Sequence, residues 1–278
     1  MKLYANIRNV VLLFTLGVLI NSCQKMDQPP LADYPKDANP PGGPLKFYAA
    51  LDEKNVDSIR ANYGTFNDAS IVDGGVSGMC AQFDGSKNGF INYPSANDFG
   101  QSTSFTISFW INITLAQKDN VNADGILAVA SSSNFWGNVC FYADHTTGGN
   151  SDSMDLKIHF ANGSGDNWDF ANYIGANRWP HMYDGQWHQV AFTYDSPSKT
   201  GTVYRDGVQF DQKTNETIAF DGNASQLVLG GFQEAAGIVD SYDNNTWMSG
   251  FPGKMDNVRL YGEALSAADI KSLYDNKE

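Results

Sequence analysis

From about residue 45 onward, apolar and polar residues alternate with the two-residue period of a β-strand that has one face in a core. In residues 105–113 every odd position is Phe or Ile, whereas the even positions hold Thr, Ser, Trp and Asn. Shorter apolar runs, each bounded by Gly, Asn, Asp or Ser, stand at 125–130, 139–142, 156–160, 187–194, 201–204, 226–229 and 257–260. Many short strands between turn residues predict an all-β chain, folded as a two-sheet antiparallel β-sandwich or jelly roll.

Two local signals refine this prediction. Asp206-Gly207 predicts a tight hairpin, because this pair suits the turn type that matches the twist of two paired strands. In residues 266–274 the apolar side chains recur with helical spacing instead, and Ser266 is an N-cap candidate with Asp269 three positions later. We therefore expect one short C-terminal helix, packed across an edge or end of a sheet.

The chain begins with the pattern of a lipoprotein signal peptide at residues 1–22. Lys2 and Arg8 accompany an apolar run of about 11 residues, too short for a helix across a bilayer core of ~30 Å. The sequence Ile-Asn-Ser-Cys, which ends at Cys23, resembles a bacterial lipobox. This resemblance implies that Cys23 is lipidated and anchors the protein through several acyl chains. A plain secretory signal cleaved nearby is the alternative.

Residues 23–44 are predicted to form a tether. Six of the ten prolines lie between residues 24 and 44, and such a segment favours extended conformations that bury little area. Proline becomes rare from Leu45 onward, where the strand patterns begin. The expected organisation is a signal peptide, a proline-rich tether and one domain at 45–278, held off the membrane surface.

The composition narrows the classes of partner. The chain has 31 acidic and 18 basic side chains, a net charge of −13, and no basic stripe, so nucleic acid is not expected to be a partner. A hydrophobic content of 42% is enough for a packed core. Three cysteines are too few for a disulfide-stapled mini-domain. Once Cys23 is set aside, Cys80 and Cys140 remain, either as a disulfide or as buried free thiols.

Five segments in order resemble the LamG-like jelly-roll family, a branch of the concanavalin A-like lectin/glucanase superfamily. They are QFDGSKNGFIN at 82–92, TSFTISFWI at 103–111, GQWHQVAFTY at 185–194, GTVYRDGV at 201–208 and FPGKMDNVRLYGEALSAADIKSLY at 251–274. The resemblance covers the chain from about Leu45 to its C-terminus and implies a concanavalin A-like sandwich. It leaves the function open, since this fold hosts lectins, glycoside hydrolases and adhesion modules alike.

Hydrolytic chemistry has little support in the sequence. A glycosidase needs two carboxylates that flank the scissile bond, and the glucanases of this superfamily carry two glutamates around an aspartate in one strand motif. None of the five glutamates stands in such a motif. Asp152 with Asp155, and Asp166 with Asp169, have suggestive spacing but lie in predicted loops, where Asp is an ordinary turn residue.

The resemblance also implies a structural calcium ion between an early acidic segment and the aspartate of the last strand motif. These positions correspond to Asp52 and Asp256 in this chain. Calcium takes oxygen ligands from carboxylates and backbone carbonyls, which acidic loops supply. The alternative is that Asp256 caps a turn before the last strand.

Carbohydrate binding is the leading hypothesis for the function. Sugar sites need aromatic rings for the apolar faces of pyranoses, together with Asp, Asn and backbone groups for the hydroxyls. Trp168 and Trp247 stand in polar sequences that predict loops, where core packing explains a tryptophan less well than a binding platform or the pinning of a loop. The candidate carbohydrate-binding residues are Trp136, Tyr142, Asp144, Trp168, Asn172 and Trp247.

Together these inferences predict a lipoprotein of a bacterial cell envelope, anchored in the outer membrane and facing the surface or the periplasm. It would bind a polysaccharide or other glycan without catalysis and would serve polysaccharide capture beside components of an uptake system. Two alternatives remain: a glycoside hydrolase that acts on O-glycosyl bonds, and a protein-binding adhesion module.

Overall fold

The computed structural model describes residues 43–278 except 53, 120, 145–150, 164–166, 223 and 240–245. For 167–172 and 224–225 it describes the backbone without the side chains. The predicted signal peptide, Cys23 and nearly all of the predicted tether lie outside the described residues. Among the helices that are described, none has the length and apolar character needed to cross a membrane.

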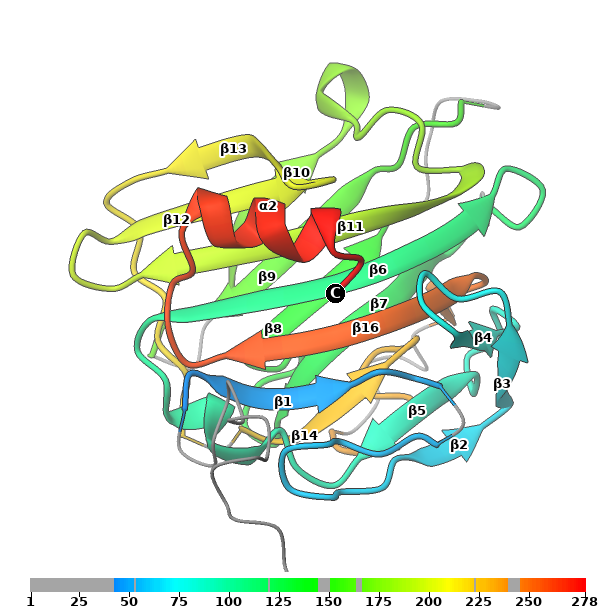
Figure 1. The fold of residues 1–278 in the computed structure, drawn as a ribbon, viewed down its shortest axis with the longest axis horizontal. Helices are drawn as coiled ribbons and strands as arrows, with labels where there is room; N and C mark the ends of the chain where they lie inside the picture. Colours follow the sequence, from blue (N-terminus) through cyan, green and yellow to red (C-terminus); the bar gives the residue numbers. More distant parts are fainter. Residues whose placement is uncertain are drawn as a thin grey trace, which may run out of the picture. The chain divides into compact units, whose positions relative to one another are not determined.

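Two β-sheets are stacked face to face, which confirms the predicted antiparallel sandwich (Figure 1). The front sheet, in the order of its neighbours, contains β13 (Val208–Lys213), β12 (Thr200–Arg205), β11 (Asp184–Asp195), β6 (Phe105–Thr114), β16 (Lys254–Tyr261), β4 (Met79–Phe83) and β3 (Ala69–Asp73), with β1 (Leu45–Ala49) beside β16. The back sheet contains β10 (Asn167–Tyr173), β9 (Leu156–Ala161), β8 (Val139–Ala143), β7 (Ala123–Ser131), β14 (Ala224–Leu229), β5 (Phe90–Tyr93) and β2 (Thr65–Asn67), with β15 (Met248–Gly250) parallel to β7.

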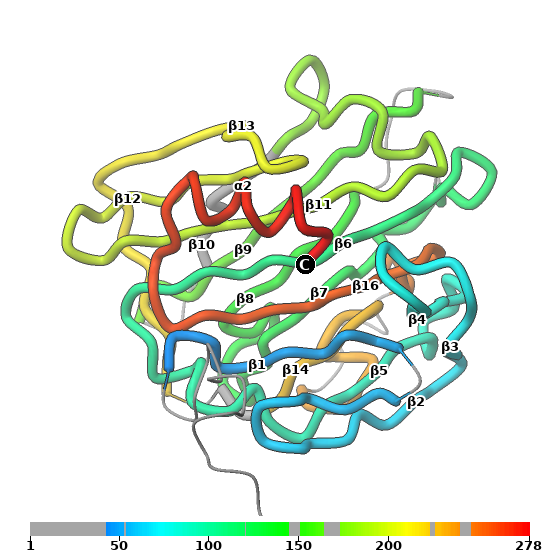
Figure 2. The backbone as a smooth tube through the Cα atoms, in the orientation of Figure 1, coloured from blue at the N-terminus to red at the C-terminus, as the bar shows by residue number. Residues whose placement is uncertain are grey.

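The chain passes repeatedly between the two sheets, so that strands far apart in the sequence become neighbours (Figure 2). β6 lies between β11 and β16, and β7 lies between β8 and β14. The predicted hairpin joins β12 to β13: Asp206 and Gly207 have φ values of 52° and 73°, the left-handed backbone that its turn type requires. Strands β2 and β15 have three residues each, too few for an apolar pattern to predict them, and β3 is not among the predicted strands either.

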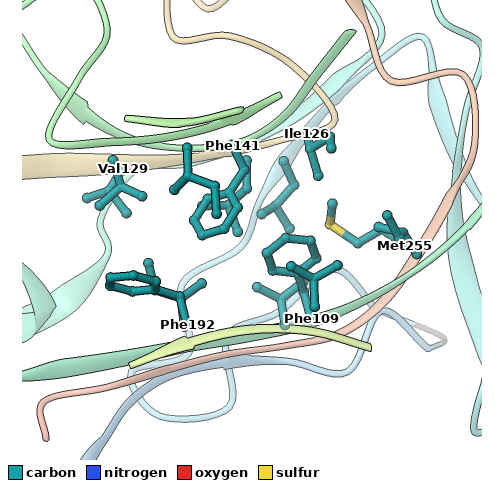
Figure 3. Close-up of a cluster of buried hydrophobic side chains, with 14 of the residues drawn as sticks. Phe109, Ile126, Val129, Phe141, Phe192 and Met255 are labelled. Atoms are coloured by element: carbon teal, nitrogen blue, oxygen red, sulfur yellow. The ribbon is translucent and has the colours of Figure 1, made fainter. Parts of the chain in front are cut away.

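The core between the sheets is built from the alternating positions that the sequence predicts. Odd residues of β6 point inward, and Phe109 packs edge-on against Phe141 of β8, with ring centroids 5.4 Å apart. Figure 3 shows these two rings with Ile126, Val129, Phe192 and Met255 in the space between the layers. Cys80 and Cys140 are buried free thiols and form no disulfide.

The even positions of β6 hold mostly polar residues, which indicates an exposed outer face, but most of that face is buried. Trp110, at an even position, is fully buried and stacks on Tyr274 of the helix α2 (Ala267–Asp275) at 5.4 Å and 14°. The expected capping box is present, since Ser266 and Asp269 each accept a hydrogen bond from the backbone N–H of the other. The expected packing across a sheet edge is wrong: α2 lies on the outer face of the front sheet because Trp110 and its apolar neighbours there require cover (Figure 1). The described part of the chain also contains the short 3-10 helices η2 (Asn97–Gln101) and η3 (Gly175–Asn177).

Candidate functional site

The outer face of the back sheet carries a pair of side-by-side rings. The register of β8 with β9 pairs Tyr142 with Lys157 and Cys140 with His159, so that Tyr142 and His159 share the outer face on adjacent strands. Their rings are nearly parallel, 10° apart, and Tyr142 Oη and His159 Nε2 share a hydrogen bond of 3.1 Å. Both side chains are buried, and they form a flat base on the sheet.

Trp136 covers this base. Its indole stacks on His159 at 4.4 Å and 6°, and on Tyr142 at 5.4 Å and 15°. The loop between β7 and β8 holds Trp136 in place, because the buried Gln233 side chain accepts from Ser131 N at 2.7 Å and donates to Phe135 O at 2.9 Å. The indole is therefore oriented by the fold before any ligand arrives.

Trp247 extends the aromatic surface outward. Its ring centroid lies 5.7 Å from that of Trp136 and 6.2 Å from that of Phe232, and 37% of the residue is exposed. Phe232 is buried and lies 5.5 Å from Tyr142, so it completes the base. We refer to Trp136, Tyr142, His159, Phe232 and Trp247 as the aromatic cluster. Trp247 and the half-buried Trp136 form its accessible layer.

An ion pair borders the aromatic cluster. Lys157 Nζ lies 2.6 Å from Asp144 Oδ2 and 5.8 Å from the centre of the Tyr142 ring. Both members of the pair are partly exposed, and the strand register places Lys157 on the same outer face as Tyr142 and His159. A ligand above Trp136 would meet flat apolar surface in the middle and polar groups at one edge.

The structure thus brings together four of the six residues predicted to bind carbohydrate: Trp136, Tyr142, Asp144 and Trp247. The other two, Trp168 and Asn172, have side chains outside the described residues. Their backbone is not the predicted loop but strand β10, where Trp168 pairs with Phe160 and Asn172 pairs with Lys157. The sequence just before the strand is rich in Gly, Ser and Asp, which favours a loop and conceals the strand.

Sequence reasoning missed His159, Lys157 and Phe232. Alternation along β9 carries the signal for the first two, since both stand at positions opposite in phase to the core residues Ile158 and Phe160. Phe232 has no such signal, because only the folded chain brings its loop onto β7 and β8. There, a Cβ on Gly125 of β7 would lie 2.6 Å from the Phe232 nitrogen, so this strand needs glycine where the loop crosses it.

Asp52 and Asp256, the predicted calcium ligands, converge on one loop. Asp256 Oδ2 accepts hydrogen bonds from Val76 N at 2.7 Å and Ser77 N at 3.3 Å, and Asp52 Oδ1 accepts from Met79 N at 2.8 Å. Asp256 is fully buried, and no described Lys or Arg forms an ion pair with it. Burial raises the pKa of its carboxyl to about 7; three backbone hydrogen bonds oppose this, and the charge of Asp52 adds to it.

The chemistry of these two carboxylates fits a hard cation. The charge of Asp52 lies close enough to disfavour that of Asp256, and a cation that takes oxygen ligands would relieve this. Within the described ranges no three His, Cys, Asp or Glu side chains gather as a metal centre, so backbone or water oxygens would have to complete the shell. The predicted capping role also has a counterpart, because Asp256 caps the loop between β3 and β4 rather than a turn before β16.

Of the aspartate pairs with suggestive spacing, Asp152 and Asp155 contact different partners. Asp155 accepts a hydrogen bond from Arg178 Nε at 2.6 Å, whereas Asp152 contacts His181 Nδ1 at 2.6 Å. Each carboxylate therefore has its own cationic or hydrogen-bonding partner. Asp166 and the side chain of Asp169 lie outside the described residues, although the backbone of Asp169 belongs to β10 rather than to a loop.

Comparison with known proteins gives a family and a fold. A family model described as the concanavalin A-like lectin/glucanases superfamily matches residues 84–271. No curated protein matches the chain in sequence. Domain 4 of AbnA, an extracellular arabinanase from Geobacillus stearothermophilus solved in complex with arabinotriose, is similar at a TM-score of 0.56 and 20% identity, over 83% of this chain and 98% of that domain.

Two toxin domains share the fold as well. The binding domain of Paraclostridial Mosquitocidal Protein 1 has a TM-score of 0.58 and 17% identity, over 84% of this chain and 52% of its own. The receptor binding domain of botulinum neurotoxin D has a TM-score of 0.56 and 13% identity, over 84% and 53%. This chain spans about half the length of either toxin domain. At these identities the likeness concerns the fold, and these neighbours include domains that bind carbohydrate or a receptor.

Proposed function

Because the chain belongs to the concanavalin A-like lectin/glucanase superfamily, we propose that it is a non-catalytic carbohydrate-binding protein whose ligand site is the aromatic cluster. The observation that carries the proposal is the layered arrangement of rings: Trp136 is stacked at 4.4 Å on a buried base, and Trp247 stands exposed beside it. Indole faces of this kind pack against the C–H faces of sugar rings.

The rigidity of the cluster favours binding. A ligand loses affinity when side chains must be ordered on association, at about 0.5–1.5 kcal/mol for each mobile side chain. Trp136 is already fixed by its stack on His159 and Tyr142, and Gln233 fixes the loop that carries it. Most of the ordering is therefore complete in the free protein.

The polar edge supports recognition of hydroxyl groups. Asp144 and Lys157 offer acceptors and donors on the side of the indoles, and a pair of ionised groups makes stronger hydrogen bonds to a ligand than neutral groups do. Binding is favoured over hydrolysis because Asp144 is already ion-paired with Lys157, and Asp152 and Asp155 contact separate partners. The arabinotriose complex of the AbnA domain supports carbohydrate as the ligand class.

The cellular setting is part of the same proposal and rests on the sequence. Lipidation at Cys23 would anchor the protein in the outer membrane, and the proline-rich tether would hold the sandwich away from the lipid. From there it would capture a polysaccharide for an uptake system. We also propose that a calcium ion between Asp52 and Asp256 stabilises the loop between β3 and β4, away from the aromatic cluster.

A glycan array with the intact chain tests the function. We expect selective binding of one group of glycans, which Trp136→Ala and Trp247→Ala each weaken at least tenfold, or about 1.4 kcal/mol. Tyr63→Ala is the matched control, since it removes an aromatic ring that is 62% exposed and outside the cluster, and it should leave binding unchanged. An array without signal, combined with capture of a purified receptor protein, would contradict the proposal and favour an adhesion module. Sustained release of reducing ends from a polysaccharide would favour a hydrolase.

A further inference from the structure

A groove lies where an edge strand of the back sheet meets an edge strand of the front sheet. We propose that this groove binds oligosaccharides that carry carboxylate groups, the uronic acid sugars. The groove has a volume of about 570 Å³. The lining residues used below are Tyr173, Asn177, Arg178, Phe210, Asp211 and Lys213. We call it the edge groove; it shares no residue with the aromatic cluster.

A β-bulge in β13 builds one wall of the edge groove. Tyr204 pairs with Gln209 and Val203 pairs with Asp211, so Phe210 is an extra residue without a partner on β12. In a regular strand Phe210 and Asp211 would point to opposite faces. Here Phe210 packs against Tyr173, and Asp211 Oδ2 accepts a hydrogen bond from Tyr173 Oη at 3.0 Å. The bulge therefore turns an apolar ring and an acceptor toward the same side.

Phe210 is a rigid, accessible ring. It is 38% exposed, yet its centroid lies 4.7 Å from that of the fully buried Trp179 and 5.2 Å from that of Tyr173. Trp179 is itself locked to Met154 by two backbone hydrogen bonds of 2.8 and 3.0 Å. Protection of a sheet edge would explain the bulge, but it would not explain an exposed aromatic ring that packs on two other rings. Such a ring suits the apolar face of a sugar.

The guanidinium of Arg178 favours an anion in the edge groove. Arg178 Nε donates to Asp155 Oδ1 at 2.6 Å, and Asp155 is buried, so the guanidinium is held in one orientation. Its terminal nitrogens form no hydrogen bond within the described part of the chain. A fixed guanidinium presents paired donors that match a planar carboxylate.

Asp211, the acid among the described lining residues, does not take up the terminal donors of Arg178. Asp211 Oδ2 accepts from Tyr173, and its Oδ1 accepts from Gln212 N at 2.8 Å, so both oxygens already have donors. Burial, together with the charge of Asp211, raises the pKa of the Tyr173 hydroxyl, which keeps its proton and continues to donate. Counted with Asp155, the named side chains comprise two cations, Arg178 and Lys213, and two anions, so the preference for a carboxylate rests on the terminal donors of Arg178 and not on net charge. Asn177 adds an amide for sugar hydroxyls.

Isothermal titration of the intact chain with defined tetrasaccharides tests the proposal. The probes are tetramers of galacturonic, glucuronic and mannuronic acid, the methyl ester of whichever binds, and a neutral tetramer of galactose. We expect at least one acidic tetramer to bind and its methyl ester to bind at least tenfold more weakly, because esterification removes the carboxylate charge. Phe210→Ala and Arg178→Lys should each weaken binding at least tenfold; the lysine keeps a cation beside Asp155 but lacks the paired donors.

Two control variants separate this site from others. Val208→Ala removes another exposed apolar side chain of β13, and Trp247→Ala removes an indole of the aromatic cluster; both should bind the acidic tetramer as the unmodified chain does. Thermal unfolding of each variant shows whether it is folded, and the ester comparison needs no variant. The proposal is overturned if no acidic tetramer binds, if the ester or the neutral tetramer binds equally well, or if Trp247→Ala removes binding that Phe210→Ala leaves intact. If the aromatic cluster proved not to bind glycans, the expected results for the edge groove would stay the same, because the two sites share no residue.

Discussion

Replacing Asp124 by Asn should change how the stability of the sandwich depends on pH. Asp124 lies on β7 opposite Ala143 and is 2% exposed, and its Oδ1 has no hydrogen-bond partner among the described residues. Burial raises the pKa of this carboxyl to about 8; the charge of Asp119 adds to the rise, and a hydrogen bond from the Asp119 backbone opposes it. Burial and, after it, the charge of Asp124 raise the pKa of the nearby Tyr183 hydroxyl.

The direction follows from proton binding. An aspartate in an unfolded chain has a pKa near 3.9, so between about pH 4 and pH 8 the folded protein keeps a proton that the unfolded chain has released. Raising the pH through this window therefore lowers the free energy of unfolding. A rise from 3.8 to about 8 corresponds to at most about 6 kcal/mol at ~1.36 kcal/mol per pH unit, and water entering near an ionised group reduces this. We expect a measured loss of roughly 2–4 kcal/mol.

Urea unfolding of the intact chain at pH 5.0 and at pH 8.5 measures the effect. The unmodified chain should be less stable at the higher pH. Asp124→Asn, which cannot ionise, should lose the share of Asp124, keep the share that the raised pKa of Asp256 contributes, and be the more stable of the two chains at pH 8.5. Asp68→Asn is the control, since it removes an exposed aspartate and should keep the unmodified profile. Parallel pH profiles for the unmodified chain and Asp124→Asn would refute the reasoning.

Two further predictions concern other parts of the sandwich. Calcium at 100 times its dissociation constant should raise the free energy of unfolding by about 2.7 kcal/mol, and Asp256→Asn should abolish this gain; an equal calcium response in the variant would contradict the proposed site. Tyr274→Ala removes the ring stacked on Trp110 and should lower the free energy of unfolding by about 2–3 kcal/mol in urea denaturation, without affecting glycan binding. A stability equal to that of the unmodified chain would show that α2 is not needed to cover Trp110.

The layered fold could be predicted because its cause is local. In β6 the inward and outward positions alternate strictly, and the Asp206-Gly207 turn and the Ser266 cap depend on neighbouring residues. The partner of Trp110 could not be predicted in the same way. Its strand alone indicates a polar outer face, and only the return of the C-terminal helix buries the indole.

In the candidate site, too, features with a local cause could be predicted and features that depend on distant residues could not. Tyr142 and His159 belong to adjacent strands, and alternation places both on one face once the register is known. The stack of Trp136 on them depends on a loop that Gln233 fixes from about a hundred residues away. The strand β10 escaped prediction because Gly, Asn and Asp dominate its approach, and the bulge at Phe210 leaves no mark on the sequence of β13.

Both outer faces of the sandwich carry aromatic side chains that must be covered from water, and the two faces are covered by different elements. Each face carries large outward aromatic residues, Trp110 on the front sheet and Tyr142 on the back sheet, and each needs cover from water. The front sheet receives a helix of the same chain, which leaves Trp110 fully buried. The back sheet receives loops that bring indoles of their own, so that Tyr142 is buried while Trp247 stays 37% exposed. The loops on the back sheet cover its aromatic residues but leave an indole exposed, and a binding face requires such an exposed ring. For this reason the proposed glycan site lies on the back sheet and not on the front sheet.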